Sequence, residues 1–158
     1  MRNTWVCKVG MIALVGGLCL GGYGLAHAEK PIKNRFKVLH NDPAWVLDRT
    51  TGLQWQIEPN GGTRTWTNAD AYCSSLGDGS RLPENKELIS LVDYSVANPG
   101  PVLPADNPFL NVVNGSNWSA TPYAGNPANA WYVDLRYGTL EWDTKTNACY
   151  VWPVRTAP

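Results

Sequence analysis

Two cysteines, Cys73 and Cys149, constrain the fold of this 158-residue chain more than any other feature. Cys73 ends the run 66–73, whose spacing predicts a short amphipathic helix, and Cys149 opens the run 149–155, which predicts the last strand. An even pair in an exported chain favours a disulfide over two thiols or half of a metal site. Such a bond would close most of the domain into a loop, which contributes on the order of 4 kcal/mol.

The expectation of export comes from the N-terminus. A basic start precedes an apolar run at 11–20, and Ala26-His27-Ala28 has the small-x-small pattern of a signal-peptidase site. The apolar run is too short to span a bilayer comfortably, so an uncleaved anchor is the less favoured alternative. We expect residues 1–28 to be a cleaved signal peptide and residues 29–158 to be one domain, with no transmembrane segment after cleavage.

Charge and histidine content exclude several functions. The chain has 13 basic and 13 acidic residues; without Arg2 and Lys8 the mature part has 11 against 13, a net charge near −2. This balance gives no reason to expect a nucleic-acid partner. His40 is the only histidine of the mature part, so any histidine-assisted nucleophile would have to use it, and a histidine-based zinc site would lack ligands. We expect no enzyme activity, no cofactor and no metal.

The sequence predicts two short helices. The first has Thr67 as N-cap and Gly77 as its stop, with an inward face of four residues: Ala69, Tyr72, Cys73 and Leu76. The second covers about 84–94, with Leu88, Leu91 and Val92 pointing inward.

Alternating apolar residues predict seven strands in a small antiparallel sheet, at 36–40, 44–48, 53–56, 117–121, 130–136, 139–142 and 149–155. The turn at 48–52 joins two of them into an N-terminal hairpin, and Gly138 turns a later pair into a second hairpin. Four prolines between 98 and 109 predict an irregular loop.

An ordered series of motifs carries a family resemblance. The series consists of Asp48-x-x-Thr51-Gly52-Leu53-x-Trp55, Trp66-x-x-Ala69-x-x-x-Cys73, Arg81-Leu82-Pro83, 117–121 (NWSAT), 130–134 (AWYVD), Gly138 and 150–155 (YVWPVR). With these motifs in this order, the chain resembles the Lcl C-terminal domain family from about residue 35 to 155. The family is named for the end domain of a bacterial collagen-like adhesin. The resemblance implies an α+β, C-type lectin-like fold with long ordered loops.

The resemblance also carries implications for the cysteines, the compartment and the ligand. An early-helix cysteine pairs with one in the last strand in such folds, and Cys73 and Cys149 match those positions; the second common disulfide has no counterpart. The resemblance implies a non-catalytic binding module, secreted, periplasmic or on the bacterial surface, and the adhesin domain is associated with glycosaminoglycan-like polysaccharides. Here the collagen-like repeat is missing and the mature charge is slightly acidic, which disfavours a polyanionic ligand.

Calcium binding is not expected either. Lectins that bind sugar through calcium use a Glu-Pro-Asn motif in a late loop, but 58–60 (EPN) precedes the first helix. Trp142-Asp143-Thr144 lies nearer the corresponding end of the domain, yet it supplies one carboxylate where calcium prefers several oxygens.

We predict that the binding surface consists of the loop 98–125 and the turn at 137–138. Five residues are candidate ligand contacts: Tyr123, Asp134, Arg136, Tyr137 and Glu141. Tyrosine rings would stack on a neutral sugar and the charged groups would bond its hydroxyls. Three alternatives stay open: the tyrosines are buried lids, the domain docks an envelope protein, or Asp134 and Glu141 are a pair of glycosidase carboxylates. Glycan binding or adhesion is the leading hypothesis.

Overall fold

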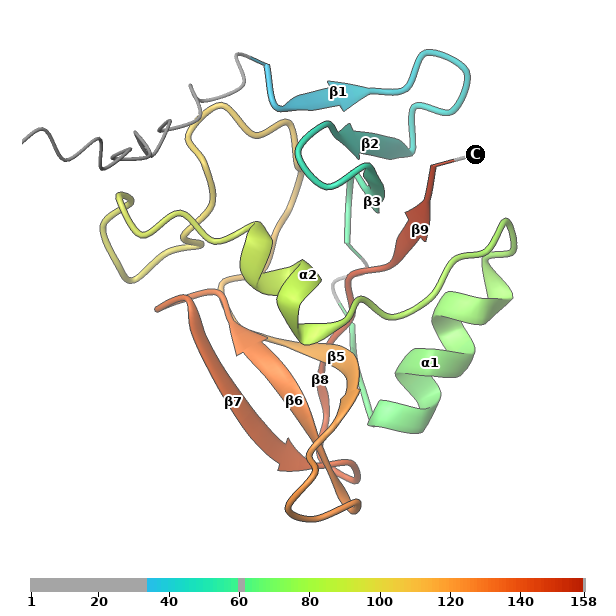
Figure 1. The fold of residues 1–158 in the computed structure, drawn as a ribbon, viewed down its shortest axis with the longest axis vertical. Coiled ribbons are helices and arrows are strands. Elements are labelled where there is room, and N and C mark those ends of the chain that lie inside the picture. Colours follow the sequence, from blue (N-terminus) through green and yellow to red (C-terminus); the bar gives the residue numbers. More distant parts are fainter. Residues whose placement is uncertain (1–33, 60–61, 158) are drawn as a thin grey trace, which may run out of the picture. The chain divides into compact units, whose positions relative to one another are not determined.

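The structure is a computed structural model that describes residues 34–59 and 62–157. Within these ranges it has two short helices and two small sheets, which confirms the predicted α+β class (Figure 1). The expected signal peptide lies outside the described residues. None of the helices that are described has the length and apolar character needed to cross a membrane.

The first sheet has four antiparallel strands in the order β1-β2-β3-β9. They are β1 (Phe36–Val38), β2 (Trp45–Asp48), β3 (Leu53–Gln56) and β9 (Val154–Thr156). The turn from β2 to β3 closes with a hydrogen bond from Gly52 N to Asp48 O of 2.8 Å, and Gly52 has a φ of 73° that favours glycine. The predicted N-terminal hairpin is therefore confirmed.

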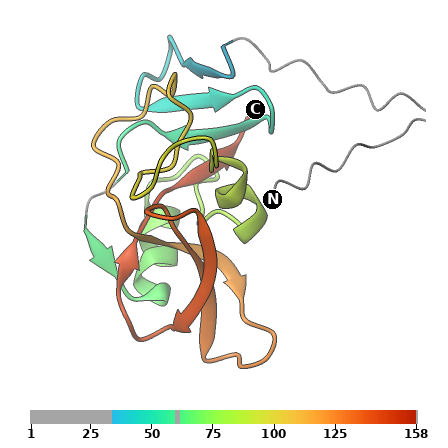
Figure 2. The same ribbon diagram turned by 90° about the vertical axis from the view of Figure 1, so that its left-hand side faces the viewer.

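The second sheet has five strands in the order β4-β8-β5-β6-β7 (Figure 1; Figure 2). They are β4 (Thr63–Arg64), β8 (Cys149–Tyr150), β5 (Ser116–Pro122), β6 (Asn129–Asp134) and β7 (Thr139–Thr144). The β5–β8 pair is parallel and the other pairs are antiparallel, so the expectation that all strands pair in an antiparallel way was wrong for this pair.

The segment 149–155 is not one strand as predicted but two, one in each sheet. Residues 151–153 lie between them, and Pro153 has no N–H to donate to a ladder. Trp152 instead donates its indole Nε1–H to Gln56 O at 2.9 Å and is fully buried. The proline and the buried indole thus carry the chain from the second sheet into the first.

Helix α1 covers Trp66–Ser75 and its N-cap is Thr65, two residues before the predicted Thr67. Tertiary contacts explain the earlier start: Trp66 donates its backbone N–H to Lys145 O at 3.1 Å and its indole N–H to Ser119 O at 2.8 Å. Gly77, with a φ of 74°, follows the end of the helix as predicted. Of the predicted inward face, Ala69 and Cys73 are buried, whereas Leu76 is exposed because it already belongs to the C-cap.

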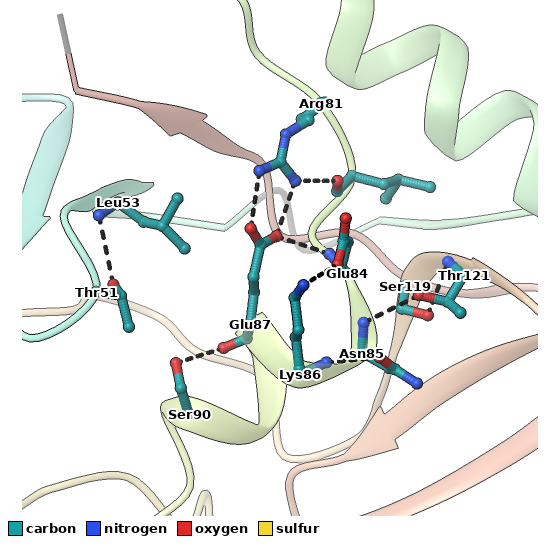
Figure 3. Close-up of polar contacts among 11 residues, drawn as sticks. Thr51, Leu53, Arg81, Glu84, Asn85, Lys86, Glu87, Ser90, Ser119 and Thr121 are labelled. Atoms are coloured by element: carbon teal, nitrogen blue, oxygen red, sulfur yellow. Dashed lines mark hydrogen bonds and ion pairs between the residues drawn. The ribbon is translucent and has the colours of Figure 1, made fainter.

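Helix α2 covers Asn85–Ser90 and begins with a capping box between Glu84 and Glu87 (Figure 3). Arg81 donates two 2.8 Å hydrogen bonds to the Glu87 carboxylate. Burial raises the pKa of Glu87, but these bonds and the one from the Glu84 backbone outweigh it, so the pKa lies below its usual value.

The helix is shorter than the predicted 84–94 because the chain turns away after its last turn. The backbone N–H of Asp93 bonds to Val102 O at 2.8 Å instead of continuing the helix. Leu88 and Leu91 are buried, as predicted, and Val92 is half-buried against the same core. The predicted irregular loop follows, and hydrogen bonds from Gly100 N to Arg136 O and from Val102 N to Leu135 O tie it to the residues just after β6.

The core consists of two clusters. One contains Trp55, Leu88, Leu91, Leu103, Val133, Leu135, Trp152 and Val154. The other contains Ala69, Cys73, Leu82, Trp118, Ala130, Cys149 and Val151. β6 contributes to both clusters, so its two sides are packed against different parts of the domain.

Cys73 and Cys149 belong to the same cluster, but both are free thiols, so the structure does not contain the expected bond. Burial raises the pKa of each thiol to about 12. The thiolate is the reactive form, so thiols held at this pKa react slowly once the domain has folded. Both cysteines thus lie in one buried cluster, and the bond between them stays a prediction.

Candidate binding site

The β6–β7 hairpin carries four of the five predicted binding residues, and its register decides which side chains share a face. Trp131 pairs with Trp142 and Val133 with Leu140, so these four side chains lie on one face. Tyr132, which pairs with Glu141, lies on the other face. β7 is an edge strand of its sheet.

Three rings form what we call the aromatic shelf: Tyr123, Trp131 and Trp142. The Tyr123 ring stacks on Trp142 with centroids 5.0 Å apart and planes 4° apart, and it meets Trp131 edge-on at 5.3 Å. Trp142 is 50% exposed. A Cβ at Gly125 would lie 2.8 Å from the Tyr123 ring, so a glycine is what allows the tyrosine to fold over the tip of the β5–β6 loop.

The reverse face carries a hollow of about 360 Å³, which we call the polar pocket. Its lining residues are Asn114, Gly115, Ser116, Tyr132, Arg136, Asp143, Ala148, Cys149 and Tyr150. Asp143 accepts two hydrogen bonds from Asn147, at 2.9 and 3.0 Å, and one from Thr144 N. These bonds fix the carboxylate at the wall of the pocket.

Beside the pocket, Tyr132 donates its hydroxyl hydrogen to Glu141 at 2.9 Å, and Glu141 also accepts a bond from Thr139. Burial and the hydrogen bond to Glu141 raise the pKa of Tyr132 to about 12, so the phenol stays protonated and keeps donating.

Arg136 holds Asp134 through three side-chain hydrogen bonds of 2.7 to 3.1 Å. Burial raises the pKa of Asp134, but the hydrogen bonds from the Arg136 side chain and backbone outweigh it and leave the pKa below its usual value. Both groups therefore stay charged at neutral pH. The same guanidinium lies 5.6 Å from the centre of the Tyr137 ring, which is 50% exposed.

The structure thus divides the five candidate residues. Tyr123 belongs to the shelf, whereas Asp134, Arg136 and Glu141 lie on or beside the reverse face, and Tyr137 sits in the turn at the far end of β6. The five steps from Asn129 to Asp134 span about 16 Å of extended strand, too far for one sugar ring to contact both ends. Asp134 and Glu141 are held by Arg136 and Tyr132 and are not direct cross-strand partners.

The sequence did not predict the pairing of Trp131 with Trp142. The period-two alternation of both strands could have revealed this pairing once the turn at Gly138 was fixed. Ser116, Tyr150 and Asp143 carry no sequence signal for a shared pocket, because they come from three different strands.

No group of three or more His, Cys, Asp or Glu side chains suited to a metal ion occurs within residues 34–59 and 62–157. His40 is exposed in the segment between β1 and β2, at the four-stranded sheet. The described residues therefore offer binding groups on the hairpin and no arrangement typical of metal or histidine chemistry.

Comparison with known proteins identifies the family. No curated protein matches the chain. The model of the Lcl C-terminal domain matches residues 44–155, which is more than half of the chain and includes both helices, the shelf and the polar pocket. The chain belongs to the Lcl C-terminal domain family.

Proposed function

We propose that this domain is a non-catalytic module that binds a neutral glycan on the aromatic shelf. The family's domain is a module of Lcl-type adhesins, which favours binding at a surface over catalysis. The two helices, small sheets and long loop are also compatible with a C-type lectin-like arrangement.

The exposed stack of Trp142 on Tyr123 carries this proposal. Trp55, Trp118 and Trp152 are fully buried, as packing residues are, whereas Trp142 keeps half of its surface in solvent. Its ring is already held by Tyr123 at 5.0 Å, so little freedom is lost when a ligand docks. A flat, pre-organised aromatic surface suits the apolar face of a pyranose ring.

Charges around the shelf favour a neutral ligand. Glu141 and Asp143 flank Trp142 along β7 and point to the reverse face, and their negative charges so close to the shelf would repel a polyanion. The Lys145 ammonium, which follows β7 in the chain, lies 4.2 Å from the centre of the Trp66 ring and is engaged there. This distribution supports a neutral sugar over a sulfated or uronic one.

We also propose that residues 1–28 direct export and that Cys73 and Cys149 become a disulfide in an oxidising compartment. Their membership of one buried cluster supports the pairing. The bond would have to form before folding buries the thiols. Thiol titration of unfolded protein purified from the periplasm tests this, and two reactive thiols per chain would argue against the bond.

A second candidate function is docking of an envelope protein along β7. Leu140 is 38% exposed on the same face as Trp142, and β7 is a sheet edge, which can accept another strand. An array of immobilised glycans separates the two functions, since a protein-docking surface would bind none of them.

The array is run with and without calcium on the natural protein and on two variants, Trp142→Ala and Tyr123→Ala. We expect both variants to weaken the glycan signal while the calcium and chelator arms agree. Leu110→Ala is the control, because Leu110 is a 52% exposed apolar side chain that lies outside the shelf. Full binding by Trp142→Ala would refute the shelf as the site.

A further inference from the structure

We infer that the polar pocket is a second sugar site on the opposite face of the same hairpin, so that one domain links two glycan chains. This inference rests on the proposed glycan binding at the shelf. It assigns a function to the candidate residues that the structure places away from Tyr123.

The two sites face opposite sides of one sheet. Trp131 and Trp142 are cross-strand partners on the shelf side. Tyr132 is the next residue of β6 and therefore points to the reverse side, together with Asp143, the residue after Trp142. A single sugar unit on the shelf leaves the pocket open, because the backbone of the hairpin lies between them.

The pocket has the size and chemistry of a sugar subsite. Its volume of about 360 Å³ lies within the roughly 300–1,000 Å³ of small-ligand sites. The Tyr132 ring offers an apolar surface, Ser116 and Asn114 offer neutral donors and acceptors, and Asp143 offers acceptor oxygens.

Arg136 adds a directed donor at the pocket wall. Its Nε and Nη2 atoms bond to Asp134, which holds the guanidinium in place. Its Nη1 makes no hydrogen bond to any residue that the structure describes. A fixed guanidinium with donor capacity left suits a sugar hydroxyl, and Asp134 neutralises its charge so that the pocket does not demand an anion.

A domain with two binding faces can link two glycan chains, whereas a domain with one face cannot. A domain that holds one polysaccharide chain on each face cross-links them, and chains with many repeats turn weak single contacts into a network. The inferred role is therefore to gather or cross-link neutral polysaccharide.

Each face can be disabled separately. Trp142→Ala removes the shelf, and Ala148→Trp fills the pocket from an exposed wall position without removing any of its hydrogen bonds. Ala97→Trp is the matched control, since Ala97 is exposed in the loop after α2 and lines neither site. Light scattering of each purified protein alone establishes its oligomeric state.

The probes are four neutral polysaccharides, dextran, mannan, xylan and galactan. Affinity electrophoresis measures binding to each, and light scattering of protein–polysaccharide mixtures measures cross-linking. For a polysaccharide that is bound, we expect the natural protein and Ala97→Trp to cross-link, and both single-face variants to stay bound while scattering falls by about tenfold or more. The double variant should no longer bind.

Three results would overturn the inference in distinguishable ways. If none of the four polysaccharides retards the natural protein, glycan binding itself fails and the second site with it. If Trp142→Ala abolishes all binding, or Ala148→Trp cross-links like the natural protein, the shelf stands and only the polar pocket is refuted. Cross-linking that survives in both single-face variants would show that it comes from association of protein copies.

Discussion

The four-stranded sheet and the β6–β7 hairpin both hold arginine–carboxylate pairs and aromatic rings, but they expose them very differently. In the four-stranded sheet Asp48 is fully buried and Arg155 is only 9% exposed, with its guanidinium 4.2 Å from the Trp45 ring. On the hairpin Trp142 and Tyr137 are each 50% exposed. The same chemical groups therefore stabilise the fold in one region and face solvent in the other.

The number of partners explains the difference. Asp48 accepts two bonds from Arg35 and one each from Thr50 N and Thr51, so its oxygens are satisfied within the protein. Arg155 is held in the same way by Gln54 and Asp42. Buried polar groups need such complete bonding, whereas exposed groups can leave capacity for a ligand. Substitutions in the two regions should accordingly affect different properties.

The largest stability loss is expected for Asp48→Asn. It removes a buried carboxylate and leaves Arg35 without its charged partner, at a cost of about 3 kcal/mol. Urea unfolding measures the change, and glycan binding of the folded variant should be unaffected. Asp106→Asn, at an exposed position, is the control. A loss for Asp48→Asn no larger than for the control would refute the structural role of this pair.

The same carboxylate predicts a loss of stability in acid. Burial raises the pKa of Asp48, but the bonds from Arg35 and Thr50 outweigh it, so its folded pKa lies below its usual value. Its contribution is therefore complete above the unfolded pKa of about 4 and is lost as pH falls through the folded pKa. Between neutral and acidic pH, the free energy of unfolding should fall less steeply for Asp48→Asn than for the natural protein. Equal slopes against pH would contradict this role of Asp48.

Trp142→Ala should show the opposite balance, with a large effect on binding and a smaller one on stability. Loss of the stacking surface should weaken glycan binding by about tenfold or more, equivalent to about 1.4 kcal/mol. The half-exposed ring should contribute no more than about 1 kcal/mol to folding, mainly through its stack on Tyr123. Isothermal titration and thermal melting measure the two effects. Intact binding with a strongly lowered melting temperature would mean that the shelf is structural.

The smallest effect on stability is expected for Glu141→Gln, whose side chain is exposed on β7. The free energy of unfolding should change by no more than about 0.5 kcal/mol. The pKa of Tyr132, raised to about 12 by burial and by Glu141, should move back toward its ordinary value. Ultraviolet titration of the phenolate reads this out, with Tyr132→Phe to assign the signal. An unchanged titration would show that burial alone sets this pKa.

Sequence patterns predicted the local elements well and their assembly less well. Period-two alternation located β2, β3, β6 and β7, and Ala69 and Cys73 identified the buried side of α1. The start of α1 was missed because Trp66 is fixed by Lys145 and Ser119, contacts across a long stretch of sequence. Short-range patterns do not contain such contacts.

The candidate site shows the same limit. Tyr123 was predicted as a candidate because a tyrosine in a turn is a plausible exposed ring, but its stack on Trp142 depends on tertiary contact between the β5–β6 loop and β7. The residues of the single predicted site lie on two faces of the hairpin, because successive side chains of a strand point in opposite directions and the register decides which of them share a face. That register is set by the tertiary pairing of strands, which composition and motif order do not specify.

The most direct test of the account follows the indole N–H signals by NMR as a neutral oligosaccharide, the one that binds best on the glycan array, is added. Trp142 and Trp131 belong to the shelf, whereas Trp45 lies beneath Arg155 at the four-stranded sheet. If the shelf is the binding site, the Trp142 and Trp131 signals shift with ligand concentration while the Trp45 signal stays in place. A shift of Trp45 with Trp142 unchanged would contradict it and would move the binding site to the four-stranded sheet.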